Sequence, residues 1–335
     1  MYVTIVVPAY NESEVLETFY KTLNPIISNL KVGAEILFVN DGSKDNTLDI
    51  IKVLAKKDSR ISYINLSRNF GKEAAMSAGL DKADGDAVIF IDADLQDPPE
   101  LIPVMIEKWL EGYDGVFARR TKRDTDTYVK RKTAQWFYRC MGKLSRVEIP
   151  ENTGDFRLIS RRSVLALRKL PETNRFMKGL FAWVGYPQAE VTYERPERAA
   201  GDTKFNYWKL WNFALDGITA FSTLPLRMAS YIGGLLALGA FIYGMVIILK
   251  TLLWGDPVAG YPSLMVVMLF LGGLQLMFMG VFGEYLGRMF EEVKRRPLYL
   301  IETHHKSNIS VNRDIVSVIP KSGSINTIEI QTEPA

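Results

Sequence analysis

Short apolar runs alternate with longer amphipathic segments over the first part of the chain, and this alternation restricts the fold more than any other feature. The runs at 3–7, 35–39, 61–66 and 87–91 have the length of buried strands, and helical segments ending near 30, 57 and 82 separate them. Because parallel strands joined by crossover helices give this order, we predict an α/β domain with a mainly parallel sheet. Further strands are expected at 114–118, near 155 and at 190–194.

Polar side chains follow three of these strands at the point where each strand ends. Tyr10 and Glu12 follow the first strand, Asp41 follows the second, and Asp92 and Asp94 follow the fourth. In open α/β sheets, ligands bind in the crevice beyond the carboxyl ends of the strands. The sequence therefore predicts that these side chains converge on one crevice.

The stretch Asp92-Ala93-Asp94 places two carboxylates at the end of a buried strand, directly before Pro98 and Pro99. Two carboxylates in a small space repel each other unless a cation lies between them. A hard divalent cation with oxygen ligands fits such a site and keeps positions open for substrate phosphates. The alternative is an ordinary strand-to-helix turn, in which aspartate and proline are common.

Several functional classes lack their sequence signatures in this chain. No Gly-x-Gly-x-x-Gly follows the first strand and no Gly-x-x-x-x-Gly-Lys occurs, which argues against dinucleotide enzymes and P-loop NTPases. The net charge of +3 gives no nucleic-acid signature. Cys140 is the single cysteine, so a disulfide framework is excluded and a reducing compartment is favoured.

Four segments occur in order along the first hundred residues: Val-Pro-Ala-Tyr-Asn-Glu at 7–12, Asn-Asp-Gly-Ser at 40–43, Arg-Asn-Phe-Gly-Lys at 68–72 and Asp-Ala-Asp-Leu-Gln-Asp-Pro-Pro at 92–99. Together they resemble the family 2 inverting glycosyltransferases with a GT-A fold. Within that family they are most similar to the polyisoprenyl-phosphate glycosyltransferases, the relatives of dolichyl-phosphate mannose synthase. The similarity covers roughly residues 3–300.

This resemblance implies roles for residues on the donor side. The residues implied in nucleotide-sugar binding are Pro8, Tyr10, Glu12, Asp41, Lys72 and Asp92. Asp92, Asp94 and Gln96 would bind a divalent cation, Mg or Mn, and through it the diphosphate.

On the acceptor side the resemblance implies an aspartate and a set of cations around the acceptor phosphate. The residues at these positions are Asp155, Arg120, Arg131, Arg198 and Lys204. Asp155 is a candidate base or orienting group, although it has the alternative of pairing with Arg157. The basic run at 119–132 is otherwise typical of a solvated surface, and Arg119 is a second candidate beside Arg120.

Two runs in the second half of the chain contain no charged residue, at 228–249 and 258–283. Each exceeds the ~20 residues needed to cross a bilayer. Cations precede the first run and follow the second, and Lys250 is the only cation between them. The sequence therefore predicts two transmembrane helices in the inner membrane, with the catalytic domain and both termini in the cytoplasm. Buried core helices are the alternative.

The predicted organisation has five parts. A GT-A catalytic domain covers 1–204, interfacial amphipathic helices rich in aromatic residues cover 205–227, and a two-helix transmembrane hairpin covers 228–287. A cytoplasmic extension of the second helix covers 288–306, and a poorly ordered tail covers 307–335. Related enzymes imply a homotetramer.

The implied reaction moves a sugar from a nucleotide to a lipid monophosphate, with inversion at the anomeric carbon. The subfamily most resembles bacterial bactoprenol glucosyltransferases, which implies UDP-glucose as donor, undecaprenyl phosphate as acceptor and a role in O-antigen modification. GDP-mannose, UDP-N-acetylglucosamine or a UDP-aminoarabinose derivative are alternative donors. A processive polysaccharide synthase is disfavoured because no Arg-Trp pair is present. A non-catalytic membrane partner of a flippase is the remaining alternative.

Overall fold

The computed structural model describes residues 1–120, 153–170, 172–173, 175–193, 224–254 and 260–307. Strand β1 (Tyr2–Ala9) lies inside an eight-stranded mixed sheet with the order β7-β5-β6-β4-β1-β2-β3-β8. The other strands are β2 (Gly33–Asn40), β3 (Ile61–Leu66), β4 (Ala87–Phe90), β5 (Gly115–Arg120), β6 (Thr153–Ser160), β7 (Gln188–Tyr193) and β8 (Ile301–His305). All the strands predicted from the sequence are confirmed.

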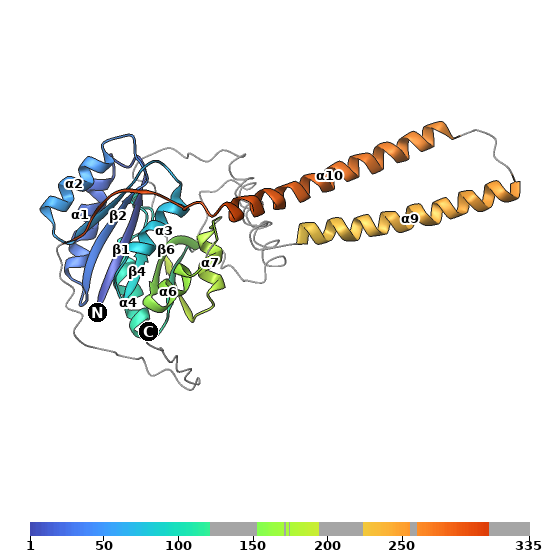
Figure 1. The fold of residues 1–335 in the computed structure, drawn as a ribbon. Coiled ribbons are helices and arrows are strands. Elements are labelled where there is room, and N and C mark those ends of the chain that lie inside the picture. The colour runs from blue at the N-terminus through green and yellow to red at the C-terminus, as the bar shows by residue number, and fades with distance from the viewer. Residues whose placement is uncertain (121–152, 171, 174, 194–223, 255–259, 308–335) are drawn as a thin grey trace, which may run out of the picture.

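Helices cover both faces of the sheet (Figure 1). Alternate side chains of β1 point to opposite faces, so Val3 and Ile5 pack on one side and Val6 on the other. The first face is covered by α1 (Leu16–Ser28), α2 (Thr47–Lys57) and α4 (Ile102–Leu110), which follows the short helix η1 (Pro99–Leu101). The second face is covered by α3 (Lys72–Lys82), α6 (Arg161–Arg168) and α7 (Met177–Trp183).

The sheet is parallel at its centre and antiparallel on one side of β4. β1 pairs in parallel with β2 and β4, and β2 pairs in parallel with β3. β6 then runs antiparallel between β4 and β5, although the chain reaches it only after β5. The start of β6 therefore lies beside the carboxyl end of β4, where the sequence placed the predicted crevice.

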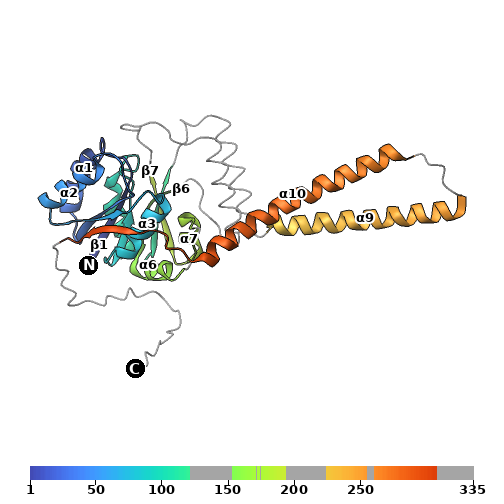
Figure 2. The same ribbon diagram turned by 45° about the horizontal axis from the view of Figure 1, so that its top comes forward.

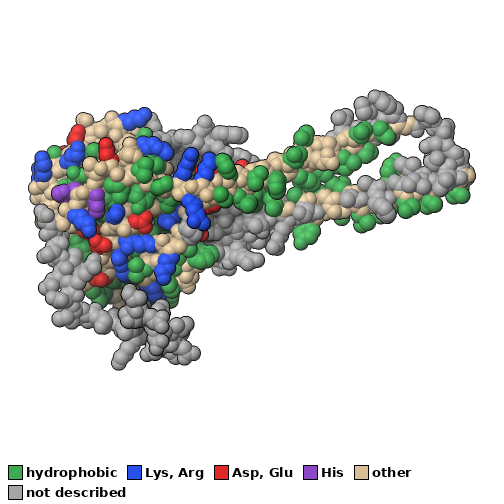
Figure 3. All heavy atoms as spheres, viewed as in Figure 1, with side chains coloured by type: hydrophobic (Ala, Val, Ile, Leu, Met, Phe, Trp, Pro, Cys, Tyr) green, Lys and Arg blue, Asp and Glu red, His purple; other side chains and the backbone are tan. Residues whose placement is uncertain are grey.

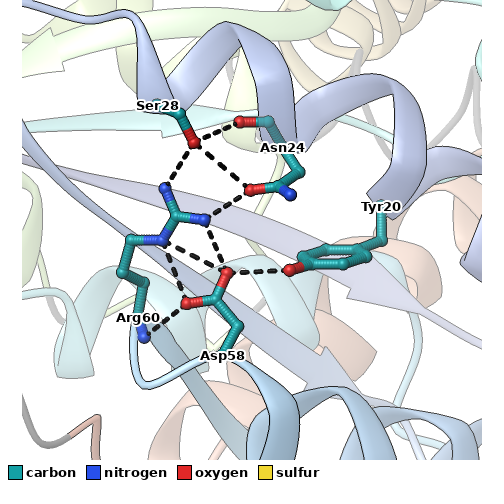
Figure 4. Close-up of polar contacts among 5 residues, drawn as sticks. All are labelled: Tyr20, Asn24, Ser28, Asp58 and Arg60. Carbon is teal, nitrogen blue, oxygen red and sulfur yellow. Dashed lines mark hydrogen bonds and ion pairs between the residues drawn. The ribbon is translucent and has the colours of Figure 1, made fainter.

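A polar network fixes α1 against the connection between α2 and β3 (Figure 4). Asp58 accepts hydrogen bonds from the Tyr20 hydroxyl at 2.8 Å and from Arg60 Nη2 at 2.7 Å. Arg60 also donates to Ser28 Oγ at 3.0 Å and to the side chain of Asn24. Although burial opposes ionisation, the hydrogen bonds from Arg60 lower the pKa of Asp58. The network supports the first face of the sheet next to the start of β3.

Two long helices, α9 (Leu224–Trp254) and α10 (Tyr261–Lys294), extend side by side from the sheet domain (Figures 1 and 2). Apolar side chains are exposed along both of them (Figure 3), among them Leu235, 74% exposed, and Leu276, 72% exposed.

The predicted transmembrane hairpin at 228–287 is not supported, and the predicted multi-pass location in the inner membrane is wrong. Within the described residues, no helix combines the length and the apolar character that a membrane span requires. The sequence prediction counted residues without charge, which is a weaker condition than sustained hydrophobicity along one helix.

The chain differs from the prediction after α10 as well. The helix ends at Lys294, and Arg295 adopts a left-handed conformation with φ of 48°. The chain then returns to the sheet, where β8 pairs antiparallel with β3 and covers that edge. Residues 288–306 are therefore part helix and part strand. The interfacial helices predicted at 205–227 lie almost entirely outside the described residues, and so does the tail after residue 307.

Candidate active site

The first two sequence motifs form adjoining loops at the carboxyl ends of β1 and β2. Asn11 has a positive φ of 54°, which is uncommon for a residue with a side chain. Its backbone N–H donates to Ser43 Oγ at 2.9 Å, and its Oδ1 accepts from the Lys44 N–H at 2.8 Å. The first motif therefore lies beside the second.

Asp41 connects the second motif to the third. Its carboxylate is almost fully buried and accepts the backbone N–H groups of Phe70 at 2.7 Å and Gly71 at 2.9 Å. Burial raises the pKa of Asp41, and the two N–H groups offset part of that effect. Both carboxylate oxygens therefore hold the loop that leads into α3.

Gly42 permits this contact because its backbone passes against the same loop. It has a φ of +60°, and a Cβ atom there would lie 2.3 Å from the carbonyl carbon of Arg68. A backbone atom cannot move aside as the end of a flexible side chain can. Glycine is therefore required on both conformational and steric grounds.

We expect Gly42→Ala to lower the free energy of unfolding by at least about 2 kcal/mol, because a left-handed conformation and a backbone clash add together. Gly185→Ala is the matched control. Gly185 has a φ of +72°, but an added Cβ would meet only ordinary contacts there. Urea denaturation of both variants measures the difference. Equal losses at the two positions would contradict the steric argument.

The turn after β4 carries Asp92, Asp94 and Gln96. Leu95, between the last two, has a positive φ of 57°, and the Gln96 N–H donates to Asp94 Oδ1 at 3.2 Å. Gln96 is buried, and its Oε1 atom has no hydrogen-bond partner. A buried amide oxygen without a donor is costly, and a cation is one group that would satisfy it.

Lys72 at the start of α3 joins the turn after β4 to β6. Phe90 of β4 is paired with Arg157 of β6, so the antiparallel register carries Asp92 and Asp155 to neighbouring positions beyond that pair. Lys72 Nζ lies 2.7 Å from Asp92 Oδ2 and 2.5 Å from Asp155 Oδ2. A single ammonium group thus bridges the two carboxylates.

The charges in this bridge stabilise one another. Burial opposes protonation of Lys72, but the carboxylates of Asp92 and Asp155 outweigh it and raise its pKa. Burial opposes ionisation of Asp155, but Lys72 and then Lys178 outweigh it and lower its pKa. Lys72 therefore stays protonated and Asp155 stays ionised at neutral pH.

The structure adds three residues that the sequence analysis did not assign to the site. Lys178 of α7 lies 3.9 Å from Asp155, and Glu73 accepts the Met177 N–H at 3.1 Å. Arg157 is buried against the ring of Phe181, and burial lowers its pKa to about 10. For Glu73, its position directly after Lys72 could have indicated that it belongs to the site. Lys178 has no such local indication, because the approach of α7 to the site depends on long-range packing.

Glu73 has an unusual environment for a carboxyl group. Burial, followed by the negative charge of Asp155, raises its pKa to about 7 from an ordinary 4.5, despite the Met177 N–H and the two nearby lysines. A raised pKa in the folded state means that the folded protein binds the proton more tightly. The stability that Glu73 contributes is therefore complete below pH ~4.5 and is lost as pH rises through ~7.

We expect Glu73→Gln to be more stable than the unaltered protein at pH 8 and nearly equal to it at pH 5. The difference should grow between these pH values by at most about 3 kcal/mol, because the amide keeps the acceptor oxygen but carries no charge. Denaturant titrations at both pH values measure it, with exposed Glu17→Gln as the control. A difference that does not change with pH would contradict the assignment.

The remaining predicted residues are cations implied on the acceptor side. Arg120 ends β5, but its side chain lies outside the described residues, as do Arg131, Arg198 and Lys204.

Within the described residues, no cluster of three or more histidine, cysteine, aspartate or glutamate side chains is placed to hold a metal ion. A metal at the turn after β4 would have two carboxylates and the free Gln96 oxygen as its protein ligands.

Comparison with known proteins identifies the family. Residues 4–167 match Glycosyl transferase family 2. An uncharacterized glycosyltransferase of Synechocystis sp. is 55% identical over 89% of this chain and 94% of its own length. The chain belongs to glycosyltransferase family 2, and it is an enzyme of the glycosyltransferase class.

Two further proteins are similar to this chain. The bactoprenol glucosyl transferase of Shigella phage SfII is 54% identical over 92% of this chain and 100% of its own length. A crystal structure of glucosyl-3-phosphoglycerate synthase from Mycobacterium tuberculosis, in complex with Mn²⁺, UDP-glucose and phosphoglyceric acid, is 21% identical with a TM-score of 0.45. That alignment covers 65% of this chain and 77% of the other.

Proposed function

We propose that this protein transfers glucose from UDP-glucose to a polyisoprenyl phosphate and releases UDP. The similarity to a bactoprenol glucosyl transferase over that enzyme's whole length supports this reaction. The observation that carries the proposal is the bridge in which Lys72 pairs with both Asp92 and Asp155. Asp92 would belong to the donor side and Asp155 to the acceptor side.

The donor would bind beyond the carboxyl ends of β1, β2 and β4. Pro8, Tyr10 and Glu12 would contact the nucleotide, and Asp41 would shape the same pocket by holding the loop at 68–71. A divalent cation would be held by Asp92, Asp94 and Gln96, whose oxygen atoms suit Mg²⁺ or Mn²⁺. When bound, such a cation would offset the charge of the departing diphosphate.

The acceptor needs cations more than it needs a base. A phosphate monoester has a second pKa of about 6, so its oxygen is already anionic near neutral pH. Asp155 is a weak base because its pKa is lowered, which favours an orienting role. Lys72 and Lys178 would offset the charge of the incoming phosphate, together with Arg120, Arg131, Arg198 and Lys204. Attack from the side opposite the diphosphate inverts the anomeric carbon.

Purified protein should release UDP from UDP-glucose only when undecaprenyl phosphate and Mg²⁺ or Mn²⁺ are both present. Turnover of GDP-mannose, UDP-N-acetylglucosamine or a UDP-aminoarabinose derivative, but not UDP-glucose, would keep the reaction class and replace the sugar. Nucleotide binding without turnover of any of these donors would favour the non-catalytic alternative. Assembly into a homotetramer stays a prediction.

A further inference from the structure

Glu292, in the last turn of α10, contacts the sheet domain through its carboxylate. Glu292 accepts the Thr173 backbone N–H at 2.9 Å on Oε1 and 3.1 Å on Oε2, and it accepts the Thr173 hydroxyl at 2.8 Å on Oε2. The two residues are 119 positions apart in sequence. Hydrogen bonds to an ionised acceptor are about twice as strong as neutral ones, so this contact fixes the backbone at Thr173.

The residues shortly after Thr173 enter the active site. Phe176 is buried, the Met177 N–H donates to Glu73, and Lys178 pairs with Asp155. Arg175 is tied at the same point, since its guanidinium donates to the Leu170 carbonyl at 2.9 Å. A shift of the backbone at Thr173 would therefore move two groups that set the charge around Asp155.

The chain that follows α10 is held against the sheet domain by two further contacts. The Tyr299 hydroxyl donates to Asp81 near the end of α3 at 2.8 Å, and Asn65 of β3 donates to Glu302 of β8 at 2.5 Å. The chain directly after α10 is thus held against α3, the helix that carries Lys72 and Glu73. Through its hydrogen bonds to Thr173, Glu292 in turn fixes the segment that leads into α7.

We propose that Glu292 is a positioning residue, which acts through Thr173 to hold Met177 and Lys178 against Glu73 and Asp155. This inference rests on the proposed function only for its kinetic readout. Its structural content is that Glu292 couples α10 to the active site through its hydrogen bonds to Thr173.

Glu292→Gln tests the coupling at nearly constant shape. An amide offers one acceptor oxygen, and its NH₂ group cannot accept the Thr173 hydrogen bonds. Glu291→Gln is the matched control, because Glu291 is the adjacent residue, is 56% exposed and pairs only loosely with Lys294 at 4.0 Å. Thr173→Val removes the hydroxyl, whereas Thr173→Ser keeps it and should restore the behaviour of the unaltered protein.

Two readouts are expected to change together. Amide hydrogen exchange in residues 175–183 of the full chain should accelerate about 10-fold in Glu292→Gln, while exchange in β1 stays the same. The turnover number should fall about 10- to 100-fold with the KM for UDP-glucose within about twofold, because misplacement of Lys178 affects the reacting geometry. Thr173→Val should show the same changes to a smaller degree.

The outcomes separate the two proposals. If the unaltered protein turns over no donor, the proposed function fails, and exchange alone decides the coupling. Unchanged exchange at 175–183 in Glu292→Gln would overturn the coupling, whatever the activity. Equal acceleration in β1 and in 175–183 would also overturn it, because the carboxylate would then support only global stability.

Discussion

Replacement of Asp94 by asparagine is expected to reduce the turnover number by at least about 1,000-fold and to abolish its dependence on Mg²⁺ or Mn²⁺. Asp94 lies on the turn after β4, where Leu95 has a positive φ and the Gln96 N–H donates to Asp94 Oδ1. An amide in place of the carboxylate removes the charge that a divalent cation requires. The fold should be unaffected, because the substitution preserves shape.

The measurement is UDP release at saturating lipid phosphate over a titration of Mn²⁺. Glu100→Gln is the control, because Glu100 is an exposed carboxylate that closely follows the same turn. Its turnover should stay within about twofold of the unaltered protein, as for most surface substitutions. If Asp94→Asn kept more than a tenth of the activity with an unaltered metal response, the proposed metal site would be wrong.

The sequence was sufficient to predict the strands around the crevice because they are buried on both faces. A strand between two layers of helices is rich in apolar residues, as at 36–39 of β2 and along the whole of β4. The polar residues that end them are local features too. Asp41 and Asp94 could therefore be selected as site residues before their neighbours were known.

β8 could not be predicted in the same way. Four of its five residues are exposed, so it has no apolar alternation, and its pairing with β3 joins segments more than 230 residues apart. An edge strand is stabilised mainly by backbone hydrogen bonds, which leave no trace in side-chain pattern. The position of β6 between β4 and β5 has a similar cause, because strand order is set by long-range packing.

The partners of Asp155 could not be predicted from the sequence either, because they also depend on long-range packing. Its acidic side chain was identified by resemblance, but its two lysine partners come from α3 and α7, on distant parts of the chain. Asp41 was expected to contact the nucleotide, yet both of its oxygens accept backbone N–H groups from the neighbouring loop. Residue type indicated that these carboxylates matter, and only the fold shows what each one holds.

Outside the turn after β4, the largest effect is expected for Lys72. Its ammonium group lies between Asp92 and Asp155, and it is the one cation within hydrogen-bond distance of both among the described residues. In Lys72→Met the two carboxylates lose their shared counter-ion, so the pKa of Asp155 should rise and binding of the acceptor phosphate should weaken. We expect a loss of at least about 100-fold in turnover, comparable to the removal of one group that stabilises the transition state.

A double-mutant cycle distinguishes this role from a general loss of charge. Asp155→Asn alone should also lower turnover about 100-fold or more, but the double variant should be little worse than either single variant, because residues that act as a unit are non-additive. Lys82→Met, an exposed lysine in the last turn of the same helix, is the control and should retain activity. Strictly additive losses would show that Lys72 and Asp155 act separately. The bridge between donor and acceptor sides would then have no part in the reaction.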